Sequence, residues 1–266
     1  MTVKTLKKQL AAAIAMTLVA TVALGSSTYA WFVSNNQVTA TTTTISALSN
    51  APFLRIGTTS NLAAATTEAS RSSESSVALY PAQVVNDSTS PKFQSAYASA
   101  ATATTERLNT RFDVGTPAAA VTADYALLQT FYIGTNDATA GSFADLKVAS
   151  VAINDAGTSE LDDALSVLVV CDSNWAVYKA SNNGAMVATY SDGTTTVSGN
   201  NTSGVLASSI EAGQNVQVDC YLFYDGSDTN VYTNNLADLT AVGATITFTA
   251  TPVTTTGTSQ TGYNGN

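Results

Sequence analysis

The chain contains no histidine, and this absence removes several classes of function at once. Histidine is the commonest general base near neutral pH and the commonest zinc ligand. A Ser-His-Asp triad and a two-histidine zinc site on a helix are therefore both excluded. A cysteine nucleophile would lack the imidazole that usually activates it. The sequence predicts neither an enzyme nor a cofactor.

Charged residues are also scarce, at 11% of the chain, compared with about 25% in ordinary soluble domains. Acids outnumber basic residues by 19 to 10, which gives a net charge of −9. Nucleic acids and anionic lipids are bound by basic surfaces, so neither is expected as a partner. Thr, Ser, Ala and Asn replace the missing charges, as in secreted β proteins and fibre subunits.

Long apolar runs are limited to one, residues 10–24, which follow three lysines among the first eight residues. The run is shorter than the ~20 apolar residues that span a membrane. Small residues follow it and end in Thr28-Tyr29-Ala30, which is typical of a signal-peptidase site. We expect residues 1–30 to be a signal peptide, cleaved between Ala30 and Trp31. Cleavage would remove three lysines, change the net charge from −9 to −12 and leave no stable membrane span.

A retained leader is the alternative, with residues 10–24 forming a helical fibre core as in type IV pilins. No acid follows the basic residues at the position that those pilins use. N-terminal sequencing of the native protein distinguishes the two cases.

The remaining chain predicts one mainly β domain, an antiparallel β-sandwich with jelly-roll-like connections and short helical insertions. The expected segments are a strand over 31–48, a sandwich over 49–253 and a flexible tail over 254–266. Residues 60–110 are rich in Ala, Ser and Thr and predict an insertion with helical turns around Val77–Val85.

Strand patterns become regular after residue 125. Period-two alternation or apolar runs predict strands over 127–133, 146–153, 165–171, 175–179, 216–224 and 245–249. In the third of these both faces are apolar, as in a central buried strand. The turn Asn183-Gly184 predicts a hairpin between residues 175–179 and 185–190.

Only two cysteines are present, Cys171 and Cys220, and both fall in the apolar phase of predicted strands. An even count in an exported chain permits a disulfide, which we predict here. In the chain-entropy model, a disulfide that closes the loop between Cys171 and Cys220 stabilises the fold by about 4 kcal/mol, less any strain.

Carboxylates gather at two places, and turns explain both. Asp162-Asp163 and the pair Asp225 and Asp228 adjoin glycines or strand ends, where acids commonly serve turns. The segment from Asn154 to Asp163 is rich in oxygen ligands that suit calcium, but it lacks the spacing of an EF-hand loop. A solvated acidic loop is the preferred interpretation, and loose calcium binding stays open.

Residues 25–40, GSSTYAWFVSNNQVTA, resemble the signature of the TasA and camelysin family of bacterial surface proteins. The matching residues are Thr28, Tyr29, Ala30, Trp31, Phe32, Ser34 and Asn35. A weaker match lies in residues 216–235, where an alternating strand is followed by an acidic, glycine-containing turn and an Asn-rich step. The two matches cover about a seventh of the chain.

This resemblance implies a jelly-roll subunit that is exported through a dedicated signal peptidase and assembles into extracellular fibres. In such fibres the N-terminal strand of one subunit completes the sheet of its neighbour. The residues expected in that donor strand are Trp31, Phe32, Val33, Val38 and Ile45. The expected partners are other copies of the chain, forming a homopolymer, and an accessory or anchoring subunit. Camelysin has been considered a metalloprotease, but a chain without histidine offers that activity no zinc site of the usual kind.

The residues after Ala30 also predict assembly through the N-terminal strand, independently of the family resemblance. A terminus that begins Trp-Phe-Val and continues as a Thr-rich strand exposes apolar surface and unpaired backbone, and both are satisfied when it joins a sheet edge. The alternative is a monomeric surface adhesin or carbohydrate-binding module, with Trp175, Tyr178, Tyr224 and Tyr232 as sugar platforms. Either reading places the protein outside the cell.

Overall fold

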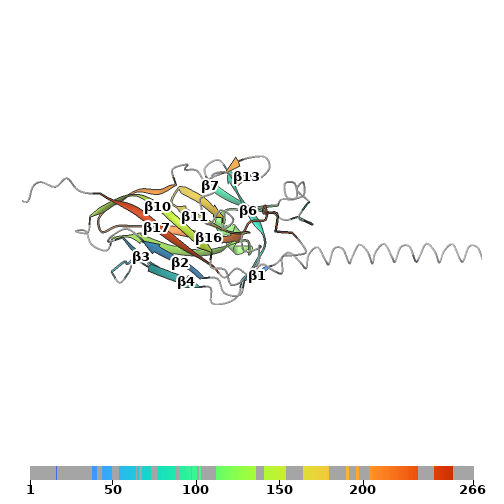
Figure 1. The fold of residues 1–266 in the computed structure, drawn as a ribbon, viewed down its shortest axis with the longest axis horizontal. Helices are drawn as coiled ribbons and strands as arrows, with labels where there is room; N and C mark the ends of the chain where they lie inside the picture. Colours follow the sequence, from blue (N-terminus) through green and yellow to red (C-terminus); the bar gives the residue numbers. More distant parts are fainter. Residues whose placement is uncertain are drawn as a thin grey trace, which may run out of the picture.

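The computed structural model describes residues 16, 38–40, 44–49, 54–63, 65, 68–72, 77–87, 90–96, 98–100, 102, 112–135, 141–153, 164–179, 190–191, 196–197, 204–232 and 243–253. These residues form a mainly β structure in which two five-stranded sheets pack face to face (Figure 1). The predicted β-sandwich with antiparallel sheets is confirmed, and its jelly-roll connectivity stays a prediction. The predicted cleavage site, residues 31–33, the acidic segment 154–163 and the tail 254–266 lie outside the described residues.

Sheet I has the strand order β15-β10-β17-β2-β4. Its strands are β15 (Val205–Ile210), β10 (Ser142–Ile153), β17 (Gly243–Val253), β2 (Thr44–Ser49) and β4 (Glu68–Ser72). Three of its four ladders are antiparallel, whereas β2 runs parallel to β17. The N-terminal part of the chain therefore lies beside the last strand of the domain.

Sheet II has the order β12-β11-β16-β9-β3 and is antiparallel throughout. Its strands are β12 (Asn174–Lys179), β11 (Leu165–Cys171), β16 (Asn215–Tyr224), β9 (Leu127–Gly134) and β3 (Arg55–Gly57). Four of these strands, all except β3, were predicted from apolar alternation or from apolar runs. Their sequences are rich in the β-branched and aromatic residues that pack well on a pleated surface.

The main core lies between the two sheets. Along β16, Val218, Cys220, Leu222 and Tyr224 face this core, because alternate residues of a strand point to the same side. From sheet I, Ile45, Ile246 and Phe248 meet them, and each of these side chains is fully buried. Burial of one such side chain contributes about 1.5–3 kcal/mol.

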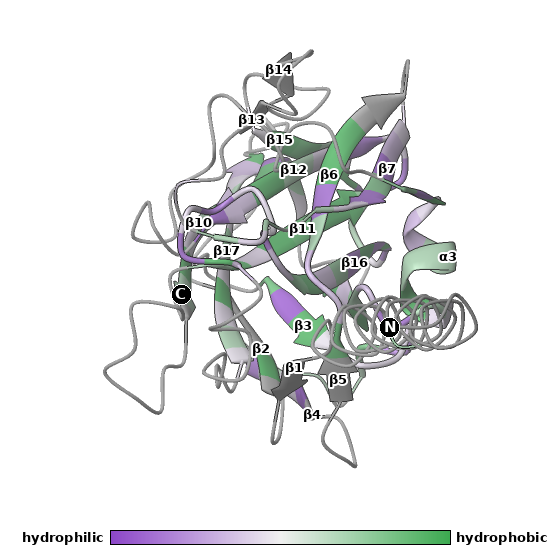
Figure 2. Cartoon of the chain, turned by 90° about the vertical axis from the view of Figure 1, so that its right-hand side faces the viewer, coloured by the Kyte–Doolittle hydropathy of each residue, from purple (hydrophilic) through white to green (hydrophobic). Residues whose placement is uncertain are grey.

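Sheet II is covered on its other face by a third layer, which Figure 2 shows end-on as β6, β7 and α3 beside β11 and β16. This layer is the three-stranded sheet of β6 (Ala82–Asp87), β7 (Ser90–Ser95) and β8 (Asp113–Gly115), with α3 (Pro117–Thr122). Phe93 packs edge-to-face on Phe223 in this second core. Both faces of β11 are consequently buried, as predicted, and β16 is buried on both faces from Cys220 to Tyr224.

Helix α3 is short and has a clear start. The Thr116 side chain accepts a hydrogen bond from Ala119 N at 3.3 Å, and Pro117 fills the first helical position, where its missing N–H is not needed. Asp124 follows with φ 60°, a left-handed residue that turns the chain towards β9.

Two local predictions were wrong. Residues 77–85 form β5 (Val77–Leu79) and most of β6 rather than helical turns, because Ala82 and Val84 pack on sheet II. The expected strand over 31–48 contains two short strands, β1 (Val38–Ala40) and β2, in different sheets. The hairpin predicted around Asn183-Gly184 stays a prediction, because most of its second arm, residues 185–189, lies outside the described residues. Its first arm is β12, which pairs with β11, and Tyr190 belongs to β13 (Tyr190–Ser191), which pairs with β14 (Thr196–Val197).

A search of the described part of the chain finds no helix with the length and hydropathy needed to cross a bilayer.

Candidate functional site

The N-terminal strands predicted to mediate assembly lie within the chain's own sheets. Strand β1 pairs antiparallel with β5, with Val38 opposite Leu79. Strand β2 is inserted between β17 and β4, with Ile45 opposite Ala244 on one side and Arg71 on the other. Ile45 is fully buried in the main core. Of the predicted donor residues, Val38 and Ile45 are thus paired inside this subunit.

Strand β2 holds sheet I together at one end. Strand β4 is the last strand of the sheet and pairs only with β2 in the described part of the chain, so it depends on β2 for its place. Without β2, the paired edge of β17 from Gly243 to Phe248 would open as a template for another strand. Residues 44–49 of this chain therefore fill the groove between β17 and β4 and complete sheet I.

The outer edge beyond β2 is protected. Glu68, Ser70 and Arg71 of β4 are all exposed. Charges on an edge strand discourage pairing with further strands, because pairing would remove them from water. The edge of β4 is therefore poorly suited to pairing with a further strand.

No protein-family model, curated protein or solved structure matches the chain.

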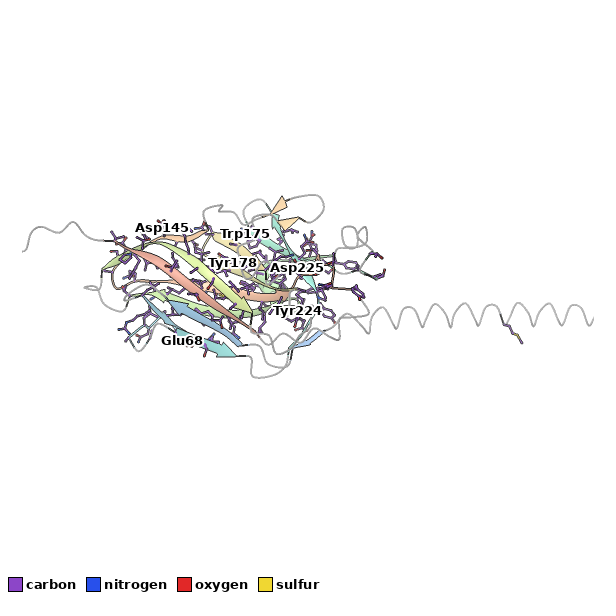
Figure 3. The ribbon with its side chains drawn as sticks, viewed as in Figure 1. Glu68, Asp145, Trp175, Tyr178, Tyr224 and Asp225 are labelled. Carbon is purple, nitrogen blue, oxygen red and sulfur yellow. The ribbon has the colours of Figure 1, made fainter. Side chains whose placement is uncertain are left out.

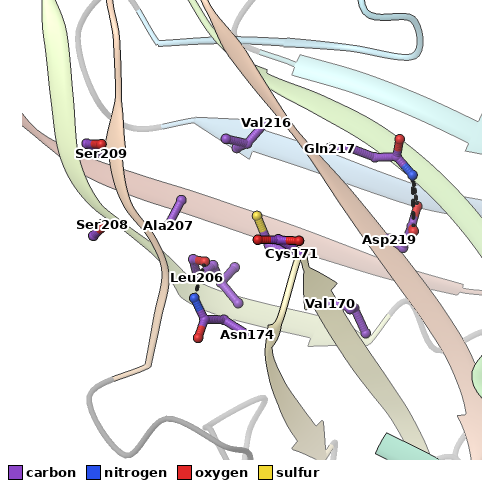
Figure 4. Close-up of a pocket in the computed structure, with 11 residues that line it drawn as sticks. Val170, Cys171, Asn174, Leu206, Ala207, Ser208, Ser209, Val216, Gln217 and Asp219 are labelled. Carbon is purple, nitrogen blue, oxygen red and sulfur yellow. Dashed lines mark hydrogen bonds between the residues drawn. The ribbon is translucent and has the colours of Figure 1, made fainter. Parts of the chain in front are cut away.

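A polar cleft of about 560 Å³ lies at one end of the sandwich, between the β11–β12 turn and strands β15 and β16 (Figure 4). Asp219 in this cleft accepts hydrogen bonds from Thr130 Oγ1 at 2.7 Å and from Gln217 Nε2 at 3.1 Å. Asn174 Nδ2 donates to Leu206 O at 3.0 Å and joins the edges of the two sheets. Among the described residues, those that line the cleft include two acids and neither a cation nor an aromatic ring.

The aromatic residues proposed as sugar platforms are in the wrong place for that role. Trp175, Tyr178 and Tyr224 are 1%, 3% and 0% exposed, and Figure 3 shows them within the body of the sandwich. Tyr232 is half-buried. The sequence pattern could not separate core aromatics from surface aromatics here, because both faces of sheet II are covered.

The paired carboxylates Asp225 and Asp228 have structural roles, as the sequence suggested. Asp228 Oδ1 accepts from Asn230 N at 2.9 Å, a local turn contact. Asp225 Oδ1 accepts from the backbone N–H and hydroxyl of Ser227, at 2.9 and 2.6 Å. Asp225 Oδ2 contacts Lys179 Nζ in a buried ion pair that the sequence analysis missed. In the described residues, no group of three or more acids or cysteines is placed to hold a metal ion.

The predicted disulfide is absent, because Cys171 and Cys220 are both buried free thiols. In the ladder between β11 and β16, Val169 lies opposite Cys220, so Cys171 is two residues further along and diagonal to it. Diagonal neighbours across a sheet are about 7–8 Å apart. Disulfides rarely bridge Cα atoms more than about 7 Å apart. Both cysteines do fall in the apolar phase of their strands, as predicted. The apolar phase does not give the register between β11 and β16, and the register decides whether the two cysteines meet.

We expect both cysteines to resist modification in the folded protein. Burial, aided by the nearby Asp172 and Asp219 charges, raises the pKa of Cys171 to about 11, and burial raises the pKa of Cys220 further. Below these pKa values the thiols are protonated, and only the thiolate reacts rapidly. Iodoacetamide at pH 8 should label neither residue in the native protein and both after denaturation without reductant. Fewer than two labelled thiols after denaturation would show that the two cysteines form the disulfide after all.

Proposed function

We propose that this protein is an exported structural subunit of an extracellular filament or biofilm matrix fibre, which polymerises by exchange of its N-terminal strand. The observation that carries the proposal is the placement of β2 between β17 and β4, with Ile45 in the core. A short N-terminal segment thus fills an internal groove of sheet I.

The same groove can accept the same segment from a neighbour. An identical strand makes identical contacts, so exchange changes only the connection between the strand and the rest of the chain. The groove of each subunit is filled by its own strand until another displaces it. Assembly should therefore be slow, and depend on nuclei or on an accessory subunit.

The residues before β1 support this proposal by their chemistry. After cleavage at Ala30, the chain would begin with Trp31, Phe32 and Val33. Burial of each against a neighbouring subunit would contribute about 1.5–3 kcal/mol before ordering costs. The resemblance of residues 25–40 to the TasA and camelysin family is consistent with secretion and with assembly at the cell surface.

The adhesin alternative has lost the feature that suggested it. Three of its four aromatic residues are core side chains, and the described residues that line the polar cleft include no aromatic ring. Homopolymer assembly is therefore preferred, with an anchoring subunit as a further partner and with no enzymatic role.

Sizing chromatography combined with negative-stain microscopy tests the proposal on the mature protein. The protein should form ladders or filaments with increasing concentration and time, and preformed filament fragments should shorten the delay. A chain that stays monomeric at every concentration, with and without such fragments, would contradict it.

A further inference from the structure

The ion pair between Lys179 and Asp225 lies on the face of sheet II that the third layer covers. Asp225 is fully buried, and the Lys179 side chain is 17% exposed. In register, Lys179 lies opposite Ser166, which in turn lies opposite Phe223 of β16, two residues before Asp225. The lysine side chain thus crosses β11 to reach the carboxylate.

The surroundings of the pair are closed and mainly apolar, with the fully buried Ser166 as the polar residue opposite Lys179. Trp175, Val177 and Phe223, which share its face, are at most 1% exposed. Strand β6 covers the site on the side of the third layer. Ala82 pairs with Asp225 in an isolated β-bridge, and Ala82 O accepts a hydrogen bond from Gly226 N at 2.9 Å. An ion pair in such a place loses the solvation of both charges. Transfer of one proton from the ammonium to the carboxylate within the pair would give a neutral amine beside a neutral acid.

The two oxygens of Asp225 have different environments. Oδ1 accepts two hydrogen bonds from Ser227, whereas Oδ2 contacts Lys179 Nζ. Oδ1 is therefore held as a carbonyl oxygen, with two donors in place to stabilise negative charge on it. Oδ2 is the oxygen that can leave. An uncharged lysine amine in an apolar site is a nucleophile.

We propose that Lys179 and Asp225 become joined by an intramolecular isopeptide bond. Nζ attacks Cγ of the protonated acid, and the negative charge develops on Oδ1 between the two Ser227 donors. A proton then passes from nitrogen to Oδ2, the Cγ–Oδ2 bond breaks, and Oδ2 leaves as water. An amine and a carboxylic acid thus give an amide and one water molecule, with no oxidant or other reactant. The bond ties the end of β12 to the turn after β16, independently of filament assembly.

The sequence makes this bond easy to detect. Lys179 is the last of the 10 basic residues, and the one before it is Lys147. Trypsin cleaves after free lysine but not after a lysine whose amine has become an amide. The unmodified protein should yield peptides 148–179 and 180–266, and the cross-linked protein a single peptide 148–266.

Intact-mass spectrometry of the mature protein, followed by tryptic mapping after denaturation, is the test. We expect a mass lower than the sequence mass by one water molecule and an intact peptide 148–266 that carries the same loss, with fragmentation placing it at Lys179 and Asp225. The full sequence mass together with complete cleavage after Lys179 would overturn the proposal.

Three variants test whether the bond forms between Lys179 and Asp225. Lys179→Arg keeps the positive charge without the amine nucleophile, so it should retain the full mass while folding by circular dichroism. Ser227→Ala removes one of the two donors to Oδ1 and should slow bond formation about 10²-fold, seen as full-mass protein soon after synthesis. The exposed Ser208→Ala is the matched control and should behave as the parent. Loss of water in Lys179→Arg would show that another pair of residues had reacted and would overturn the assignment.

Discussion

Removing residues 31–47 is expected to abolish filament growth and to turn the subunit into an inhibitor of the intact protein. The truncated chain lacks most of β2 but keeps β17, so it has an open acceptor groove and no strand to donate. Added in small amounts to the parent, it should accept the strand at a growing end and offer none to the next subunit. Growth should stop at a truncated-to-parent ratio well below one, as followed by light scattering and microscopy.

Controls separate strand donation from a general loss of stability. Removal of residues 254–266, the tail predicted to be flexible, should leave growth unchanged. A synthetic peptide of residues 31–47 should inhibit the parent by occupying the groove, and its scrambled version should not. Trp31→Ser combined with Phe32→Ser should weaken assembly more than Thr41→Ser, because aromatic side chains bury the larger area. Filaments from the truncated chain that match those of the parent would rule out donation.

Gly226→Ala is expected to destabilise the domain by about 3 kcal/mol or more. A Cβ at this position would lie 1.6 Å from Ala96 O and 2.4 Å from Ala96 C. These are backbone atoms that follow β7 in the third layer, and they cannot move aside as a flexible side chain does. The substitution would force the third layer away from the turn after β16. Gly226 N of this turn donates a hydrogen bond to Ala82 O of β6 in the third layer, and this contact would be lost.

Gly141→Ala is the matched control for this change. It has open space around the added Cβ, but its φ of 86° is unfavourable for alanine and should cost about 1–2 kcal/mol. Urea denaturation followed by circular dichroism measures both variants. Equal midpoints for the two would show that the third layer is not held as closely as the structure places it.

Four strands of sheet II, all except β3, could be predicted because their apolar residues are frequent and, in β9 and β16, periodic. In β16 the alternation of Val218, Cys220 and Leu222 defines one buried face, and the same positions line the core in the structure. The run in β11 was correctly assigned to a central strand, because neither of its faces is polar. Alternation in β16 and the two apolar faces of β11 are properties of each strand's own sequence, so they can be recognised without knowing the fold.

The third layer could not be predicted, because its partners are far away in the sequence. Residues 60–110 are dominated by Ala, Ser and Thr, which show no period of their own. Ala82 and Val84 become core residues only because they meet Trp175 and Phe223 across the outer face of sheet II. Small side chains suit this close approach but carry little hydrophobic signal.

The ion pair left a partial signal that was missed. Lys179 is in phase with Trp175 and Val177, and it is the last cation in a strongly acidic chain. A lysine in the apolar phase of a buried strand requires a buried acid. Only the fold identifies that acid as Asp225, because β11 lies between the two strands. The parallel ladder between β2 and β17 was equally hidden, since no turn connects them.

A disulfide across the ladder of β2 and β17 tests strand exchange most directly. Ser46 lies opposite Thr245, and paired strands are about 4.8 Å apart, within the range that a disulfide spans. The native thiols are buried, so Ser46→Cys with Thr245→Cys adds the two reactive positions. Filaments of this variant, oxidised after assembly, should give a ladder of covalent oligomers on a non-reducing gel, and subunits oxidised before assembly should fail to polymerise until reduced. Oxidised filaments that dissociate entirely into internally cross-linked monomers would show that each subunit keeps its own strand.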